Sequence, residues 1–247
     1  MSPADFMNLN IKDGKYMLMT EKHHAYIVLE FYRELKKRKG DLGTEIFRCA
    51  ARIYGEERGH RMALRVLRDG YPLNYDSYFA YSEWESTEGY FDVTMKAGSK
   101  TVEECVTKCP WAQVFSEEGC PECGIDYCSE IDRSIVRGFN PNLKLDMPKI
   151  QYKDGCCQFF FKDSSITENC FYLGEQMAEK SRGPILLPFS YHCGHVYAVF
   201  RKVLTDTLLE EGEESIQAVY NRLLQRLGEE FMNCLEEYQN QNFSSLP

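Results

Sequence analysis

The spacing of apolar residues predicts helices at both ends of the chain. Apolar side chains recur every three or four residues in four stretches, which places them along one face of each helix. Gly40-Asp41 separates the first two stretches, and Gly70-Tyr71-Pro72 ends the second. The chain is therefore expected to begin and end in pairs of amphipathic helices, at 21–40, 42–69, 191–209 and 213–237.

The middle of the chain contains aromatic-rich, partly alternating segments that are typical of strands. YFAYSEWE and GYFDVTMKA, between Tyr78 and Ala97, predict one antiparallel hairpin. LKLDMPKIQY and CCQFFFK predict a second hairpin around Lys153-Asp154-Gly155, where glycine accepts a positive φ. Thr101, followed three residues later by Glu104, predicts a helix start through a capping box. A further helix is expected at 123–138.

These elements predict an α+β fold, with a four-stranded antiparallel sheet between an N-terminal and a C-terminal helix pair. A single domain over 1–247 is expected, with a helical pair, then hairpins and cysteine-rich helices, then a helical tail, at 1–72, 73–165 and 166–247.

The two helix pairs also share a spaced pattern of residues. His24-Ala25-Tyr26, Gly40 and Gly55-Glu56-Glu57 correspond to His195-Val196-Tyr197, Gly212 and Gly228-Glu229-Glu230. The pattern suggests a pseudo-twofold internal repeat, and its alternative is a chance likeness of two amphipathic helix pairs.

The charge balance excludes some classes of partner. A net charge of −9 and a pI near 5.2 argue against binding to nucleic acid or to anionic membranes, both of which require a basic surface. The first residues have no basic start followed by an apolar stretch, and no apolar run reaches the roughly 20 residues that cross a bilayer. We therefore expect a cytoplasmic protein that acts on a small molecule, with a homo-oligomer left open.

Eleven cysteines are many for such a chain, and in a reducing compartment they suggest metal binding, thiolate chemistry or burial rather than disulfides. Cys120-Pro121-Glu122-Cys123-Gly124 has the form of half a zinc ribbon. A zinc site needs two further ligands, and an oxidisable thiol pair is the alternative. The nearby candidate ligands are Cys105, Cys109, Cys128, His192, Cys193 and His195.

A set of rare residues between 101 and 161 is arranged in a recognisable order. Cys109-Pro110 comes first, then Cys128 with Asp132 just before Phe139-Asn140-Pro141, and then Gly155 before Cys157 and its aromatic strand. In order and spacing this segment resembles the L-2-amino-thiazoline-4-carboxylic acid hydrolase family. The resemblance implies a hydrolase that opens a small cyclic amidine, such as 2-amino-thiazoline-4-carboxylate, to an N-carbamoyl-cysteine-type product. Cys120 and Cys123 are not part of the resemblance.

The implied chemistry assigns candidate roles to the residues of this segment. The ring carbon that lies between nitrogen and sulfur requires a nucleophile, a group that holds the amidine, and a proton donor. A cysteine thiolate can attack, and a carboxylate can hold an amidinium through paired hydrogen bonds. The catalytic candidates are Cys109 and Cys157 as nucleophiles, Asp132 for the amidine and His195 as acid or base. The candidates for substrate binding are Cys128, Asn140 and His192.

Each of these residues also has a structural interpretation, because buried cysteines and helical histidines are common and an Asn before Pro often forms a turn. Three functional interpretations remain after this comparison. The first is a hydrolase of C–N bonds in cyclic amidines. The second is a cysteine-rich, metal-binding sensor of small molecules, and the third is a diverged family member that cleaves another C–N or C–S bond.

Overall fold

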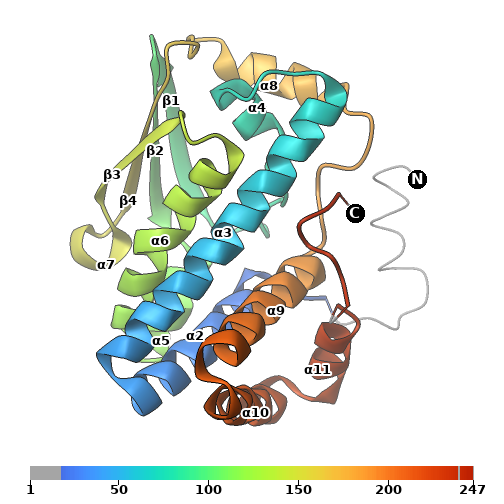
Figure 1. Cartoon of the computed structure of the whole chain (residues 1–247). Helices are drawn as coiled ribbons and strands as arrows, with labels where there is room; N and C mark the ends of the chain where they lie inside the picture. The colour runs from blue at the N-terminus through green and yellow to red at the C-terminus, as the bar shows by residue number, and fades with distance from the viewer. Residues whose placement is uncertain (1–17, 239, 247) are drawn as a thin grey trace.

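Two long helices near the N-terminus form the centre of the fold (Figure 1). In the computed structural model, which describes residues 18–238 and 240–246, α2 spans Glu21–Lys39 and α3 spans Asp41–Asp69. Both agree with the helices that the apolar spacing predicts. The start of the chain, on which the expectation of no leader rests, lies outside the described residues. No described helix is long and apolar enough to cross a bilayer.

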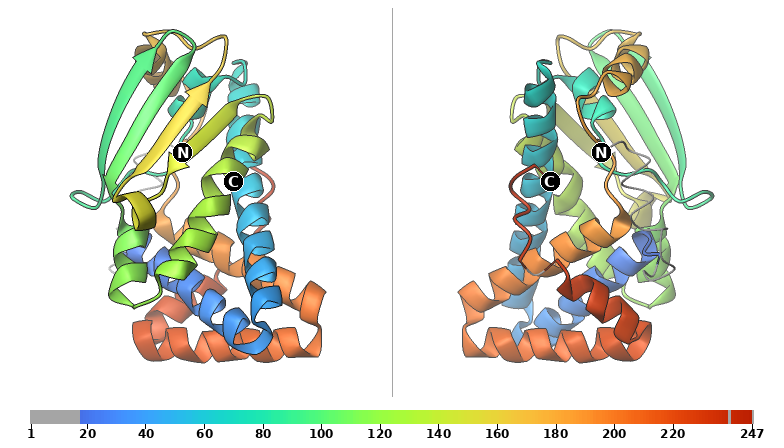
Figure 2. Two further views of the ribbon diagram at one scale, coloured as in Figure 1. Left: turned by 90° about the vertical axis from the view of Figure 1, so that its left-hand side faces the viewer. Right: turned by 90° about the vertical axis from the view of Figure 1, so that its right-hand side faces the viewer.

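The predicted four-stranded antiparallel sheet is confirmed, with the strand order β1-β2-β4-β3. The fold class is therefore α+β. Helices α6 and α3 lie on one side of the sheet, and the C-terminal helices gather at the far end of the molecule (Figure 2). The strands are β1 (Asp92–Gly98), β2 (Thr101–Lys108), β3 (Lys144–Lys149) and β4 (Cys157–Lys162).

The first hairpin is shifted along the chain from its predicted position. Thr101–Lys108 is strand β2, so the predicted helix at Thr101 is wrong, and the aromatic segment from Tyr78 lies instead in and after the short helix α4 (Tyr75–Ala80). Val102 is buried and pairs with Phe161 of β4, so pairing within the sheet outweighs the capping-box signal. Glu104 accepts a hydrogen bond from the Tyr75 hydroxyl at 2.7 Å instead of capping a helix.

The predicted helix at 123–138 is confirmed as α6 (Pro121–Phe139), which follows the shorter α5 (Pro110–Glu117). Helix α6 packs on α3 with almost no space between the two backbones. A Cβ at Gly55 would lie 2.7 Å from the Ser134 Cβ, and one at Gly59 would lie 2.0 Å from the Ile135 carbonyl oxygen. Glycines therefore set the distance between the two helices that carry the candidate site.

The C-terminal region is helical, as expected, but its last predicted helix is two helices. Gly228, with φ 86°, separates α10 from α11, because this backbone conformation ends a helix. The turn between β3 and β4 is also helical. The elements are α7 (Gln151–Asp154), α8 (Cys170–Glu179), α9 (Phe189–Leu208), α10 (Glu210–Leu227) and α11 (Glu229–Glu236).

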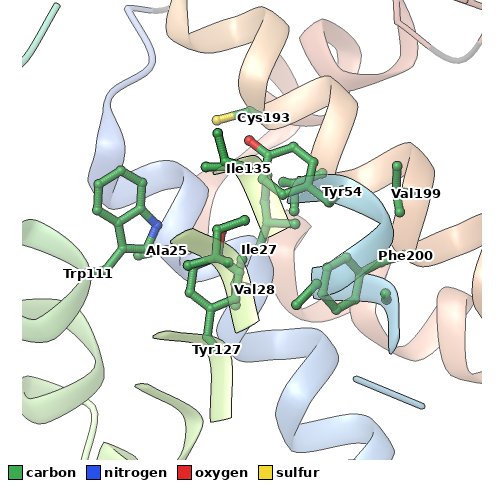
Figure 3. Packing of buried hydrophobic residues seen from close by; sticks show 14 of the residues in the cluster. Ala25, Ile27, Val28, Tyr54, Trp111, Tyr127, Ile135, Cys193, Val199 and Phe200 are labelled. Carbon is green, nitrogen blue, oxygen red and sulfur yellow. The ribbon is translucent and has the colours of Figure 1, made fainter. Parts of the chain in front are cut away.

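Helix α9 returns to the centre and closes the core against α2 and α3. Phe200 of α9 lies 5.1 Å from Phe31 of α2 and 5.4 Å from Phe47 of α3, measured between ring centroids. Figure 3 shows Phe200, Tyr54 and Trp111 converging around α2 from three other helices. This aromatic packing explains why the two helix pairs, distant in sequence, form one core.

The two helix pairs turn in the same way. Gly40 between α2 and α3 has φ 56° and ψ −125°, and Leu209 between α9 and α10 has φ 53° and ψ −123°. A Cβ at Gly43 or Gly212 would lie within 2.3 Å of a carbonyl oxygen of the preceding helix. In this geometry Gly212 corresponds to Gly43, whereas the sequence pattern aligned it with Gly40. The internal repeat itself stays a prediction.

Candidate functional site

Four of the candidate residues lie together between α5, α6 and the start of β4. Cys109 is the residue before α5, Cys128 and Asp132 are one turn apart on α6, and Cys157 begins β4. Their charges interact, because ionisation of Asp132 raises the pKa of Cys109, Cys128 and Cys157 alike. The structure therefore brings together four residues, of which the first and the last are 48 positions apart in the sequence.

Cys109 is held as a neutral thiol at the N-terminus of α5. Burial raises its pKa to about 12, and hydrogen bonds from the backbone N–H groups of Ala112 and Trp111 oppose that rise. Helix N–H groups favour an anion, but here they do not offset desolvation. Cys109 therefore needs a base, or a cation brought by a ligand, before it becomes a thiolate.

Asp132 is the group in this cluster that titrates closest to neutral pH. Burial raises the pKa of its carboxyl to about 6, while the nearby guanidinium groups of Arg58 and Arg133 lower it. Arg58 is itself 4% exposed, so its charge acts from inside the protein. A carboxyl with a pKa near 6 can both accept and donate a proton under physiological conditions.

Burial also opposes ionisation of Cys128 and Cys157. Burial raises the pKa of Cys157 to about 11, and its Sγ accepts a hydrogen bond from the Gln151 N–H at 3.3 Å. Burial also raises the pKa of Cys128 well above its usual value. Tyr152 completes the group, since its pKa is raised by burial and then by the charges of the cysteines around it. We call Cys109, Cys128, Asp132, Tyr152 and Cys157 the acid cluster.

One cavity reaches the acid cluster from the surface. Its volume is about 710 Å³, large enough for a small heterocycle, and both Cys109 and Tyr152 line it. Lys22 of α2 and Lys108 of β2 line the same cavity, and neither forms an ion pair with a described residue. Lys22 lies 5.2 Å from the ring centre of Tyr90, and Lys108 donates a hydrogen bond to the Gly89 carbonyl. Polar side chains line much of the remaining wall, including Glu88, Thr107, Gln113, Ser116 and Gln151.

Comparison with known proteins identifies the family. The sequence profile described as L-2-amino-thiazoline-4-carboxylic acid hydrolase matches residues 20–161, which is more than half of the chain. The protein belongs to the L-2-amino-thiazoline-4-carboxylic acid hydrolase family. The match begins at α2, well before the cysteine-rich segment that carries the resemblance in the sequence. No curated protein and no solved structure matches the chain.

The histidines proposed as acid or base lie beyond the part of the chain that this hydrolase family covers. His195 is fully buried in α9, its Nε2 lies 2.7 Å from Glu57 Oε2, and its ring stacks on Phe243 at 4.4 Å. Arg61 lies 3.4 Å from Nδ1, and a guanidinium can only donate, so Nδ1 accepts and Nε2–H donates to Glu57. Burial lowers the pKa of His195 well below its usual value. His195 is therefore a neutral core residue and does not line the cavity.

His192 has the same character. It is fully buried, burial lowers its pKa to about 3, and its Nε2 lies 3.4 Å from the Glu83 carbonyl oxygen. Neither histidine belongs to the acid cluster. Both lie beside a set of buried ion pairs, which Glu83 forms with Arg58, Arg61 and Arg65. We call these four residues the Glu83 cluster.

The Glu83 cluster is a group of ion pairs inside the protein. All four side chains are less than 5% exposed, and the shortest N–O distances lie between 2.5 and 3.4 Å. Burial opposes ionisation of Glu83, but Arg61, Arg65 and Arg58 lower its pKa to about 2. The guanidinium of Arg58 also lies 4.1 Å from the ring centre of Trp84, so a cation–π interaction stabilises part of the excess positive charge.

Asn140 lies away from the acid cluster, at the end of α6. Its Nδ2 donates to the Leu73 carbonyl at 2.6 Å and its Oδ1 accepts from the Asn142 N–H at 2.9 Å. One end of the amide therefore holds the turn after α6, and the other end binds the backbone of the segment after α3. The structural interpretation of Asn140 accounts for its contacts, and a role in substrate binding finds no support in them.

The zinc interpretation of Cys120 and Cys123 lacks further ligands. Cys120 precedes α6 and Cys123 lies in its first turn, where a hydrogen bond from Cys123 lowers the pKa of Cys120. Burial raises the pKa of Cys123. Within residues 18–238 and 240–246, no group of three His, Cys, Asp or Glu side chains is arranged to hold a metal ion. The pair does not fit a complete zinc site, and the dithiol alternative remains a prediction.

The sequence did not indicate three groups at the site. Arg58 is buried, although His60, two residues later on the same helix, is exposed. Arg58, Arg61 and Arg65 continue the helical spacing of Tyr54, so a basic stripe on the apolar face of α3 was the available signal. Tyr152 and the two cavity lysines carry no pattern of their own, because segments far apart in sequence place them there.

Proposed function

We propose that the protein hydrolyses a small cyclic amidine that also carries a carboxylate, with 2-amino-thiazoline-4-carboxylate as the leading substrate. The observation that carries this proposal is the acid cluster behind a cavity lined by Cys109 and two lysines. Family membership supports the same substrate.

The charges of the site complement such a substrate. The five members of the acid cluster all become negative when they ionise, so each opposes ionisation of the others. A bound amidinium would supply the missing positive charge and favour both Asp132 carboxylate and Cys109 thiolate. Lys22 and Lys108 suit the carboxylate at the other end of the molecule.

The reaction can be written with Cys109 as nucleophile and Asp132 as the proton carrier. Asp132 removes the thiol proton, the Cys109 sulfur bonds to the ring carbon between nitrogen and sulfur, and the bond from that carbon to the ring sulfur breaks. The proton then passes from Asp132 to the departing thiolate. Water, deprotonated by Asp132, displaces Cys109 from the same carbon and leaves a carbamoyl group, and Asp132 returns that proton to the Cys109 sulfur.

This balance refines the bond that is cleaved. Both C–N bonds of the amidine carbon remain in an N-carbamoyl-cysteine, one water is consumed and one thiol is released. A hydrolase that forms this product therefore breaks a C–S bond, rather than the C–N bond expected from the sequence. Cys109 is preferred to Cys157 as nucleophile because it lines the cavity, whereas Cys157 is 7% exposed and lies behind it.

The test is turnover of 2-amino-thiazoline-4-carboxylate, followed by titration of the released thiol. We expect Cys109→Ser to lower kcat by at least about 10³-fold and Asp132→Asn by about 10²- to 10⁴-fold, with native circular dichroism. Mass spectrometry of quenched reactions should find the ring-opened substrate attached to Cys109. Full activity of both variants would contradict the proposal.

Two further variants separate the alternatives. Cys49→Ser, on a partly exposed cysteine outside the acid cluster, is the matched control and should keep full activity. His195→Gln tests whether His195 acts as an acid or base. We expect kcat within about threefold of the parent protein, because His195 is buried under the ring of Phe243. A loss of 100-fold or more with native stability would return His195 to the catalytic site.

A further inference from the structure

A helical turn beside the cavity carries two buried polar atoms without partners. Among the described residues, neither the Tyr152 hydroxyl nor the Gln151 Oε1 has a hydrogen-bond partner, although both atoms are enclosed. The Gln151 amide cannot be reversed to solve this, because its Nε2 already donates to the carbonyls of Thr107 and Gly155. A buried hydroxyl without a partner destabilises a protein by about 1–3 kcal/mol, so its presence calls for a reason.

The fold makes room for this hydroxyl at a particular place. Gly124 of α6 lies directly under the Tyr152 ring, and a Cβ there would lie 2.0 Å from Cζ and 2.1 Å from the hydroxyl oxygen. Any larger residue at position 124 would therefore displace the Tyr152 ring. Gly124 lies one turn before Cys128 on α6, so the phenol tip is directed into the acid cluster rather than into solvent.

Tyr152 also has the right ionisation behaviour for a hydrogen-bond donor. Burial, and then the nearby cysteine charges, raise its pKa, so the phenol keeps its proton when a cysteine ionises. Tyr152 and Cys109 both line the cavity. An O–H group that is already buried beside the site can stabilise a developing anion after only a small movement.

We propose that Tyr152 is a further catalytic residue, whose phenol O–H donates a hydrogen bond to the Cys109 sulfur as that sulfur becomes an anion. The inference rests on the proposed function for its reaction, but the bond to the Cys109 anion can be tested without turnover. At rest the hydroxyl makes no hydrogen bond to a cysteine sulfur among the described residues, so the bond forms only when the ionised Cys109 sulfur, a much stronger acceptor than the thiol, draws the O–H within reach.

The first test is Tyr152→Phe, which keeps the ring over Gly124 and removes only the hydroxyl. We expect kcat for 2-amino-thiazoline-4-carboxylate to fall about 10- to 100-fold with little change in KM, and the melting temperature to rise. Alkylation of Cys109 by iodoacetamide, measured by peptide mass spectrometry, should slow about tenfold because the thiolate is less stable.

The matched control is Tyr191→Phe. The Tyr191 hydroxyl is likewise buried without a partner among the described residues, but it lies beside the Glu83 cluster. This variant should raise the melting temperature and leave both kcat and Cys109 alkylation unchanged. Gly124→Ala should lower kcat at least as much as Tyr152→Phe, and the double variant should lose little more, because both changes remove the same hydrogen bond.

The outcomes separate this inference from the proposed function. Unchanged kcat and unchanged Cys109 alkylation in Tyr152→Phe would overturn the inference while turnover by the parent protein stands. A lowered melting temperature with unchanged alkylation would also overturn it, because the hydroxyl would then be a structural donor. If the parent protein does not open the thiazoline but Tyr152→Phe still slows alkylation, the proposed function fails and the hydrogen bond to Cys109 stands.

Discussion

The acid cluster and the Glu83 cluster are both groups of ionisable side chains inside the protein, but their charges are arranged in opposite ways. In the Glu83 cluster a carboxylate is surrounded by three guanidinium groups, and its pKa is lowered. In the acid cluster every member is an acid, and pKa values are raised. In the first arrangement the protein itself supplies both signs of charge, with positive charge in excess, whereas the second favours a cationic ligand.

Arg58 connects the two clusters. It pairs with Glu83 at 3.4 Å, and its charge also lowers the pKa of Asp132. The close contact of α3 with α6 at Gly55 and Gly59 brings Arg58 of α3 near Asp132 of α6. The Glu83 cluster therefore supplies the site with a buried cation, Arg58, which keeps the pKa of Asp132 near 6 rather than higher.

The largest effect is expected from Glu83→Gln. This change leaves three buried guanidinium groups without their shared anion, and the free energy of unfolding should fall by about 3–5 kcal/mol in urea denaturation. Glu56→Gln is the matched control, since Glu56 pairs with Arg137 on the surface, where such pairs contribute less than about 1 kcal/mol. Similar stabilities for the two variants would remove the distinction between the clusters.

The sequence predicted the acid cluster better than the Glu83 cluster, for physical reasons. Cys109, Cys128, Asp132 and Cys157 were predicted from the resemblance to the hydrolase family, and α5, α6 and β4 bring these residues together. The environment of His195 depends on Arg61 and on Phe243 near the far end of the chain. Helical spacing placed His195 on the correct helix, but burial by such distant segments is not visible in spacing.

The fold shows the same division between local and distant information. Helices α2, α3 and α6 have strong apolar periodicity and appear where the sequence predicts them. The segment from Thr101 carries both a capping-box pattern and a strand pattern. Pairing with its neighbour β1 on one side and with β4, more than 50 residues away, on the other makes it a strand.

A smaller effect, of opposite sign, is expected from Asp132→Asn. The folded-state pKa near 6 exceeds the value of about 3.9 of an unfolded aspartate, so the folded protein loses stability as pH rises through this window. At pH 7.5 the variant should therefore be more stable than the parent by up to about 3 kcal/mol, and the difference should disappear near pH 3.5.

The ionisation of Asp132 also predicts the pH dependence of activity. Because Asp132 must be a carboxylate to remove the Cys109 proton, kcat/KM of the parent protein should rise through a pH of about 6. Denaturation at several pH values and initial rates over the same range check the two effects together. A variant that is less stable than the parent at pH 7.5 would place Asp132 with the paired, structural carboxylates such as Glu83.

The smallest effect is expected at the cavity lysines, which lie outside both clusters. Lys108→Met and Lys22→Met each remove a cation suited to the substrate carboxylate and leave the acid cluster intact. Each should raise KM about tenfold, equivalent to about 1.4 kcal/mol, with kcat nearly unchanged. Lys144→Met, on an exposed strand end, is the control and should change neither constant. A loss of kcat without a change in KM would instead place the lysine charge at the reacting carbon. The lysine would then take part in the chemical step together with the acid cluster.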